Sequence, residues 1–281
     1  MANRGFLGTT VTVAALAAAV ATLVFLTVEA GPAEASFPGQ NGKMAFVRSN
    51  DVWTMNPDGS GQTNLTNTPD VWETNPAFSP DGTKLVFQGS LPNTQGVGVY
   101  EIYTVNADGT DLRRLTYNDR SDSGPAWSPN GDKIVCFSGG HSDRALRTMD
   151  ADGTDEETLV ADVDYVGGNP AWSPDGSRIA FVSYEEEGAY DDKGYDLTES
   201  VSVVDADGSD PTRIAGPYYE VDDRPTWSPD GDRVAFRVTD GPDGDSEVFA
   251  NSIVDIHVAD TDGSGAPRLV RTKEIGETYP A

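Results

Sequence analysis

The chain has 281 residues, of which 37% are hydrophobic, and it contains 30 glycines and 18 prolines. This composition favours a β protein rich in tight turns over a helical one, and the length is sufficient for one large domain or two small ones. The 46 acidic and 19 basic residues give a formal net charge of −27, which repels a phosphate backbone and argues against nucleic acid as a partner. Basic protein faces, basic peptides or cations are the expected counterparts.

The N-terminal segment has the pattern of an export signal. Residues 6–28 carry no charge, and Ala33, Glu34 and Ala35 fit the small-x-small pattern of a signal-peptidase site. Residues 1–35 are therefore interpreted as a signal peptide or, because the apolar run is long enough to span a bilayer, as an uncleaved membrane anchor. In either case we expect an exported protein, located in the periplasm, outside the cell or at the cell envelope, with membrane contact only if the segment is retained.

A phrase of about thirteen residues recurs along the rest of the chain. It reads AFSPDGTKLVFQG at 77–89, AWSPNGDKIVCFS at 126–138, AWSPDGSRIAFVS at 171–183 and TWSPDGDRVAFRV at 226–238. The prolines that precede these phrases are spaced by 49, 45 and 55 residues, which suits the four-stranded blade of a β-propeller. Each unit is expected to contain strands A to D, of which B and C are rich in β-branched and aromatic residues.

The recurring residues have predicted structural roles. Proline fixes φ at the first corner of the A–B turn and glycine takes a left-handed conformation that closes the hairpin. The tryptophans are expected in the core between blades. The structural repeat residues are Trp127, Trp172, Trp227, Pro80, Pro129, Pro174, Pro229, Gly82, Gly131, Gly176 and Gly231. A second turn signal of the type N/D-x-D-G recurs five times and marks the C–D turns.

The first unit lacks a strand A, because residues 42–47, 51–56 and 63–66 supply strands B, C and D without a preceding PAW. The last five residues, ETYPA at 277–281, match ETNPA at 73–77, where a strand A begins. We therefore predict an all-β fold over residues 36–281, a single propeller domain of five blades closed by pairing of the C-terminal strand with the N-terminal blade. A truncated six-bladed array is the alternative.

The phrase WSPDG, its apolar B strand, the N/D-A-D-G turn and the final RLT resemble the WD40-like repeat of TolB-type β-propellers over about residues 40–281. The resemblance implies a periplasmic scaffold that binds other envelope proteins. The additional N-terminal α/β domain of that family has no counterpart between Ser36 and Gly42.

Up-and-down connectivity places the short A–B and C–D turns at one end of the blades and the variable B–C and D–A connections at the other. Variable loops on a rigid scaffold are the usual binding sites. The position three residues before the blade proline holds a carboxylate in four units and a glycine, Gly167, in the remaining one. The carboxylates Glu73, Asp122, Asp222 and Glu277 are predicted to form an acidic ring at the channel mouth, or else to cap the turn before strand A.

A second predicted binding surface is the B–C connection at 183–200, where acidic residues alternate with tyrosines. A solvated insertion has a similar composition. The residues assigned to this loop rim are Tyr184, Glu186, Tyr190, Asp192 and Tyr195.

Signals for catalysis or metal binding are few. Asp150, Asp152 and Asp155 have part of the spacing of a calcium loop but lack its full pattern and distal Glu, so hairpin turns explain them. There is no G-x-S-x-G motif, and Cys136 fits a buried core thiol.

Two functions are carried forward. The first is a non-enzymatic, monomeric scaffold without cofactor that binds a protein or peptide with a basic surface. The alternative is a metal-dependent, calcium-type hydrolase or lyase that acts on a sugar-like ligand at the channel mouth.

Overall fold

The computed structural model describes residues 42–91, 98–140, 144–161, 169–186, 197–218, 221, 224–240 and 253–270. The chain divides into two compact units, residues 1–34 and 35–281, and all the described residues lie in the second. In these ranges every regular element is a β-strand, and no helix is long and apolar enough to cross a membrane. The all-β fold class predicted from the sequence is confirmed.

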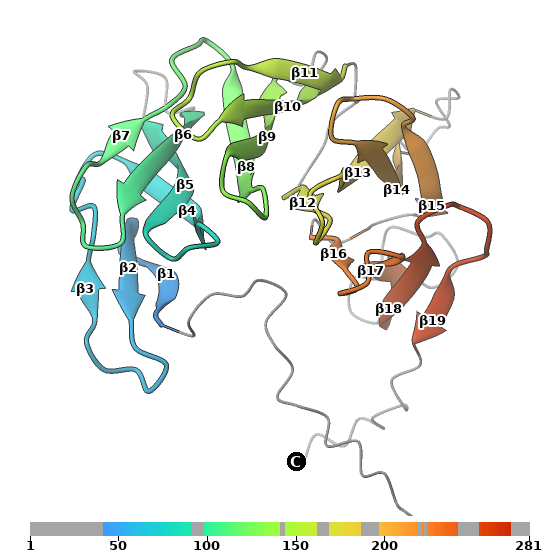
Figure 1. The fold of residues 1–281 in the computed structure, drawn as a ribbon, viewed down its shortest axis with the longest axis horizontal. Coiled ribbons are helices and arrows are strands. Elements are labelled where there is room, and N and C mark those ends of the chain that lie inside the picture. Colours follow the sequence, from blue (N-terminus) through green and yellow to red (C-terminus); the bar gives the residue numbers. More distant parts are fainter. Residues whose placement is uncertain are drawn as a thin grey trace, which may run out of the picture. The chain divides into compact units, whose positions relative to one another are not determined.

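The described strands form five antiparallel sheets that follow one another in chain order (Figure 1). The first sheet has three strands: β1 (Met44–Arg48), β2 (Asp51–Met55) and β3 (Thr63–Asn64). The second contains β4 (Trp72–Phe78), β5 (Lys84–Leu91), β6 (Val99–Asn106) and β7 (Arg113–Arg114). The third contains β8 (Ser121–Trp127), β9 (Lys133–Gly139), β10 (Ala145–Asp150) and β11 (Glu157–Val160).

The remaining two sheets repeat this order with short inner strands. The fourth contains β12 (Ala171–Trp172), β13 (Arg178–Glu186), β14 (Leu197–Asp205) and β15 (Thr212–Tyr218). The fifth contains β16 (Thr226–Trp227), β17 (Arg233–Asp240), β18 (Ile253–Asp260) and β19 (Arg268–Val270). Each sheet corresponds to one predicted blade. The closing strand predicted at 277–281 lies outside the described residues.

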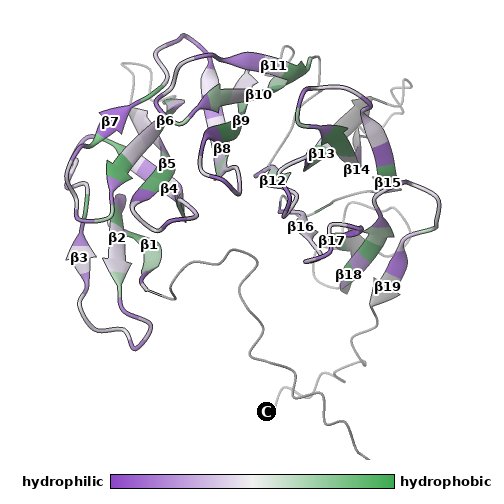
Figure 2. Cartoon of the chain, viewed as in Figure 1, coloured by the Kyte–Doolittle hydropathy of each residue, from purple (hydrophilic) through white to green (hydrophobic). Residues whose placement is uncertain are grey.

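The hydrophobic core lies between successive sheets. Four clusters of buried apolar side chains fill the four seams between the five sheets. Figure 2 shows the corresponding pattern, with hydrophobic colour on strands such as β9 and β13 and hydrophilic colour on the outer strand β7. Because the B strands pack on both faces, their central residues are continuously apolar and buried, as at 85–87 and 134–137.

The recurring tryptophans connect one inner strand to the next. The indole N–H of Trp127 donates to the carbonyl of Ala77 at 3.3 Å, that of Trp172 to Ala126 at 3.3 Å, and that of Trp227 to Ala171 at 2.9 Å. All three rings are buried. Each tryptophan therefore fills a seam and also pairs its N–H across it, which confirms the predicted position between blades.

Candidate functional site

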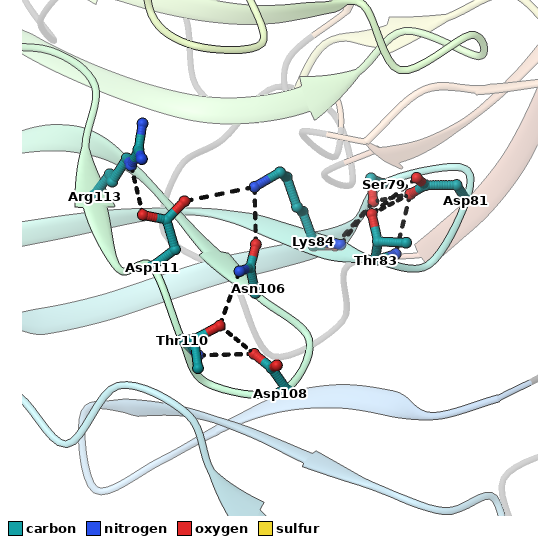
Figure 3. A network of polar contacts seen from close by, with 9 residues as sticks. All are labelled: Ser79, Asp81, Thr83, Lys84, Asn106, Asp108, Thr110, Asp111 and Arg113. Carbon is teal, nitrogen blue, oxygen red and sulfur yellow. Dashed lines mark hydrogen bonds and ion pairs between the residues drawn. The ribbon is translucent and has the colours of Figure 1, made fainter.

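The turn end has nearly the same construction in the second to fifth sheets, and Figure 3 shows it in the second sheet. In the second sheet the Ser79 hydroxyl donates to Asp81 Oδ1 at 2.6 Å and accepts from the Lys84 amide at 3.0 Å. The Thr83 amide donates to the same Asp81 oxygen at 3.0 Å, and Gly82 has φ 71°. Side-chain and backbone bonds from Ser79 and Thr83 hold the pKa of Asp81 below its usual range. The predicted left-handed turn glycine is confirmed.

The C–D turns use the aspartate that precedes their glycine in a similar way. Asp108 Oδ1 accepts from the Thr110 amide at 2.9 Å and from its hydroxyl at 2.6 Å, and Asp152 makes the same contacts with Thr154. These bonds lower the pKa of both aspartates. The carboxylates of the D-G turns are thus committed to turn geometry.

Glu73 lies at the opposite end, in β4, and its carboxylate joins the first two sheets. Its side chain is 1% exposed. Oε2 accepts from the Val52 amide of β2 at 2.8 Å and from the Thr66 hydroxyl at 2.5 Å, while Oε1 accepts from the Thr68 hydroxyl at 2.6 Å. Burial raises the pKa of Glu73, and the bonds from the two threonines and Val52 oppose that shift. In the free protein this carboxylate caps the connection before β4.

Asp122 occupies the same repeat position in β8, but its side chain is one methylene shorter and does not accept the equivalent backbone hydrogen bond from the preceding sheet. It is also 1% exposed. Asn118 Nδ2 donates to Asp122 Oδ2 at 2.8 Å, whereas Oδ1 accepts no hydrogen bond among the described residues. Two of the four predicted ring carboxylates are therefore buried between sheets, and Asp222 and Glu277 lie outside the described residues. The ring as a ligand site stays a prediction.

A different carboxylate serves the seam beside Asp122. Glu101 of β6 accepts from the Thr116 hydroxyl at 2.6 Å and forms an ion pair with Arg114. The Thr116 hydroxyl oxygen in turn accepts from the Ile102 amide at 2.9 Å. In the first sheet the corresponding amide, that of Val52, donates to Thr66 and Glu73. Burial raises the pKa of Glu101. This exchange of glutamate and aspartate between repeats was not identified from the sequence. Alignment of the repeats would have indicated it, because Glu73 aligns with Asp122 and Asp51 aligns with Glu101.

Two large aromatic side chains are exposed at the loop end. Trp72, the first residue of β4, is 57% exposed, and Tyr117, in the connection from β7 to β8, is 75% exposed. Trp72 lies opposite Ser90 of β5, which lies opposite Tyr100 of β6, so Trp72 is at the end where the B–C connection leaves the sheet. The Arg114 guanidinium lies 4.7 Å from the centre of the Tyr117 ring. Neither aromatic residue was predicted as a site, although Trp72 begins β4 next to a connection and Tyr117 lies in one, and the repeat leaves these connections variable.

The predicted loop rim is only partly described. Tyr184 and Glu186 belong to β13, opposite Glu199 and Leu197 of β14, which extends the fourth sheet toward the loop end. Tyr190, Asp192 and Tyr195 lie outside the described residues. The binding role of all five residues stays a prediction.

Within the described ranges no group of three His, Cys, Asp or Glu side chains is arranged to hold a metal ion. Cys136 is a buried free thiol in β9, and burial raises its pKa well above the usual value. His257 of β18 lies between Tyr218 and Phe236, with ring centres 5.6 and 5.9 Å away. Cys136 therefore has the environment of a core side chain, and His257 is a half-buried residue packed against two aromatic rings.

Comparison with known proteins agrees with the repeat architecture. Residues 33–160 match the family model of the TolB beta propeller domain. Over these residues the chain is similar to TolB-type propeller repeats. It is similar to the crystal structure of TolB from Acinetobacter baumannii, with a TM-score of 0.57 and 16% identity over 81% of this chain and 52% of that chain. The putative TolB of Agrobacterium tumefaciens gives a TM-score of 0.60 and 23% identity, over 81% of this chain and 76% of that one.

A curated relative, an uncharacterized protein of Agrobacterium fabrum, is 28% identical over 161 residues, which are 57% of this chain and 52% of the relative. The chain thus spans about half of the length of this relative and of the Acinetobacter TolB. The propeller fold and the TolB-like repeat predicted from the sequence are confirmed by these similarities.

Proposed function

We propose that this chain is an exported, non-enzymatic propeller scaffold that binds a protein or peptide with a basic surface at the loop end of its sheets. The observation that carries the proposal is the exposure of Trp72 and Tyr117 at that end. Tryptophan and tyrosine supply large contact area at low entropic cost and are enriched at the centres of binding interfaces.

The preference for a basic partner follows from charge and from ring chemistry. A net charge of −27 attracts cationic ligands over a long range and speeds their encounter. At short range the face of an exposed aromatic ring binds lysine and arginine side chains. Tyr117 already accepts such a contact from Arg114 of its own chain, and its side chain remains largely exposed.

The rest of the sheet supports these two residues as a rigid base. Glu73, next to Trp72, is held by three hydrogen-bond donors, and Thr116, next to Tyr117, is held by Glu101 and the Ile102 amide. A pre-organised surface loses little conformational entropy on binding. Export of the chain is supported by the uncharged segment 6–28 and the Ala-x-Ala site that follows it.

The test is selection of peptides from an unbiased displayed library on the immobilised protein at about 150 mM salt. The proposal predicts enrichment of sequences containing lysine or arginine, and loss of that enrichment on a Trp72→Ala, Tyr117→Ala double variant. A Leu112→Ala variant is the matched control, because Leu112 is an exposed apolar residue that follows a C–D turn at the other end. Enrichment of acidic sequences, or loss of binding in the Leu112 variant alone, would contradict the proposal.

A further inference from the structure

Three side chains connect the interior of the second sheet to its loop end. Glu101 is 3% exposed, Arg114 is partly exposed and Tyr117 is 75% exposed. Arg114 Nη2 donates to Glu101 Oε1, and Arg114 Nε donates to the Thr116 carbonyl at 2.6 Å. The guanidinium carbon lies 4.7 Å from the centre of the Tyr117 ring. A cation is thus held between a buried carboxylate and one face of an exposed aromatic ring.

The neighbouring sheets form without this arrangement. The first sheet has Asp51, Asn64 and Asn67 at the corresponding positions, and Asn64 Nδ2 donates to Asp51 Oδ2 at 2.7 Å. The third sheet has uncharged residues at all three positions: Ala145, Thr158 and Ala161. The repeat therefore does not require an ion pair beside an aromatic ring at this place.

The position of Arg114 bears directly on the binding of a basic ligand by Tyr117. A ligand cation on the free face of the ring and the guanidinium on the other face repel each other, because both are positive and only the ring separates them. Glu101 offsets this repulsion, since its carboxylate is held against the guanidinium and makes the pair neutral. Without that carboxylate charge, Tyr117 would present a ring backed by an uncompensated cation.

We propose that Glu101 determines the affinity of Tyr117 for cationic ligands by neutralising Arg114. Glu101 is buried and acts through Arg114 rather than by contact with the ligand, so it is a positioning residue of the binding site. The inference rests on the proposed binding of a basic peptide and identifies the residue that regulates it. Because Glu101 is buried, solvent screens its charge less than that of a surface carboxylate.

The surroundings of Glu101 make its charge dependent on pH. Burial raises the pKa of Glu101, Arg114 of β7 opposes that shift, and the charge of Asp122 of β8 adds to it. Tyr103, on the same strand as Glu101, interacts electrostatically with Glu101 and with Glu73 of β4. A carboxylate loses its charge as the pH falls through its folded pKa, so Glu101 becomes neutral at a higher pH than an exposed glutamate. Affinity for a basic ligand should fall over the same interval.

The test measures the Kd of a lysine-rich peptide from the selection, and of the same peptide with norleucine in place of lysine, on a cycle of variants. Glu101→Gln leaves Arg114 uncompensated and is expected to weaken binding of the lysine peptide about three- to tenfold, without weakening that of the norleucine peptide. Arg114→Gln removes the competing cation and is expected to strengthen binding of the lysine peptide. The double variant, which is again neutral, should recover the affinity lost in Glu101→Gln.

Asp111→Asn is the matched control for the loss of one acidic charge. Asp111 forms an ion pair with Arg113 at 2.7 Å at the turn end of the same sheet. Its replacement changes the net charge by the same amount as Glu101→Gln, and is expected to change the Kd of the lysine peptide by less than about twofold, because the charge is distant from Tyr117 and screened.

A pH titration of the unmodified chain gives a second readout that does not depend on the folding of any variant. The preference for the lysine peptide over the norleucine peptide should decrease as the pH falls from about 7.5 to about 5, and should change less in Glu101→Gln.

Weaker binding of the lysine peptide by both single variants and by the double variant would show that the ion pair only holds Tyr117 in place, and would overturn the inference. An unchanged Kd in Glu101→Gln, or a preference independent of pH, would also overturn it. In these cases loss of binding in the Trp72→Ala, Tyr117→Ala double variant would still support the proposed function. Absence of binding by any basic peptide would overturn both.

Discussion

The two ends of the sheets differ in how strictly they follow the repeat. At the turn end the same serine, aspartate or asparagine, and glycine make the same hydrogen bonds in the second to fifth sheets. At the loop end equivalent positions hold different residues with different partners, as Glu73 and Asp122 show. Uniform contacts mark the scaffold, and the positions that depart from them are where binding specificity can differ between sheets.

The largest expected difference in stability between the two ends concerns two tryptophans, Trp172 in a seam and Trp72 at the loop end. Trp172→Ala removes a buried ring and its N–H bond to Ala126, and is expected to lower the free energy of unfolding by about 3–5 kcal/mol. Trp72→Ala removes an exposed ring at the loop end and is expected to change it by less than about 0.5 kcal/mol. Urea denaturation of both variants measures the difference. Equal losses would show that Trp72 belongs to the scaffold.

The second effect compares the two buried carboxylates. Glu73→Ala leaves the Thr66 and Thr68 hydroxyls without their acceptor and the Val52 amide with only its longer bond to Thr66, and is expected to lower the free energy of unfolding by about 2–3 kcal/mol. Asp122→Ala removes one such bond together with an oxygen that accepts no hydrogen bond from the described residues, so a loss of about 1 kcal/mol or less is expected. The reverse order in urea denaturation would contradict the assignment of Glu73 as the inter-sheet cap.

The third and smallest effect lies at the turn end. Hydrogen bonds led by that from the Ser173 hydroxyl lower the pKa of Asp175 to about 2. A carboxylate with a lowered pKa contributes stability that is present above its unfolded pKa and is lost as the pH falls through its folded pKa. The contribution of Asp175 should therefore disappear between about pH 4 and pH 2.

Asn130 provides the matched control for this turn, because its side-chain oxygen accepts from Ser128 at 2.8 Å and from the Asp132 amide at 3.2 Å. Asp175→Asn should thus fold with a slightly lower Tm at pH 7, because the carboxylate's contribution is absent, and show a smaller fall in Tm from pH 4 to pH 2 than the unmodified chain. Asn130→Asp should show a larger fall. An identical pH profile for all three proteins would contradict the role given to the carboxylate.

The scaffold could be predicted from the sequence because its contacts are local or repeated. Turn geometry depends on residues two to five positions apart, as between Ser79 and Lys84, and recurrence of the phrase identified four strand pairs at once. The tryptophans could be assigned to seams because large apolar residues at constant spacing pack against the same neighbour in each repeat.

The loop end could not be predicted to the same depth because its contacts join positions that the repeat does not relate. The expectation of carboxylates at a channel mouth depended on position alone. The contacts depend on side-chain length: Glu73, which is one methylene longer than Asp122, reaches the Val52 amide, whereas the Ile102 amide donates to Thr116, which in turn donates to Glu101. The exposure of Trp72 follows from the strand alternation that buries Glu73, and becomes evident only once the register with β5 is known.

Hydroxyl-radical footprinting with and without a bound lysine-rich peptide from the selection tests the central claim most directly, because it reports on both ends of one molecule. Trp72 and Tyr117 at the loop end should be oxidised several-fold more slowly in the complex, while Leu112 near the turn end keeps its rate. Protection of Leu112 without protection of Trp72 and Tyr117 would contradict the account.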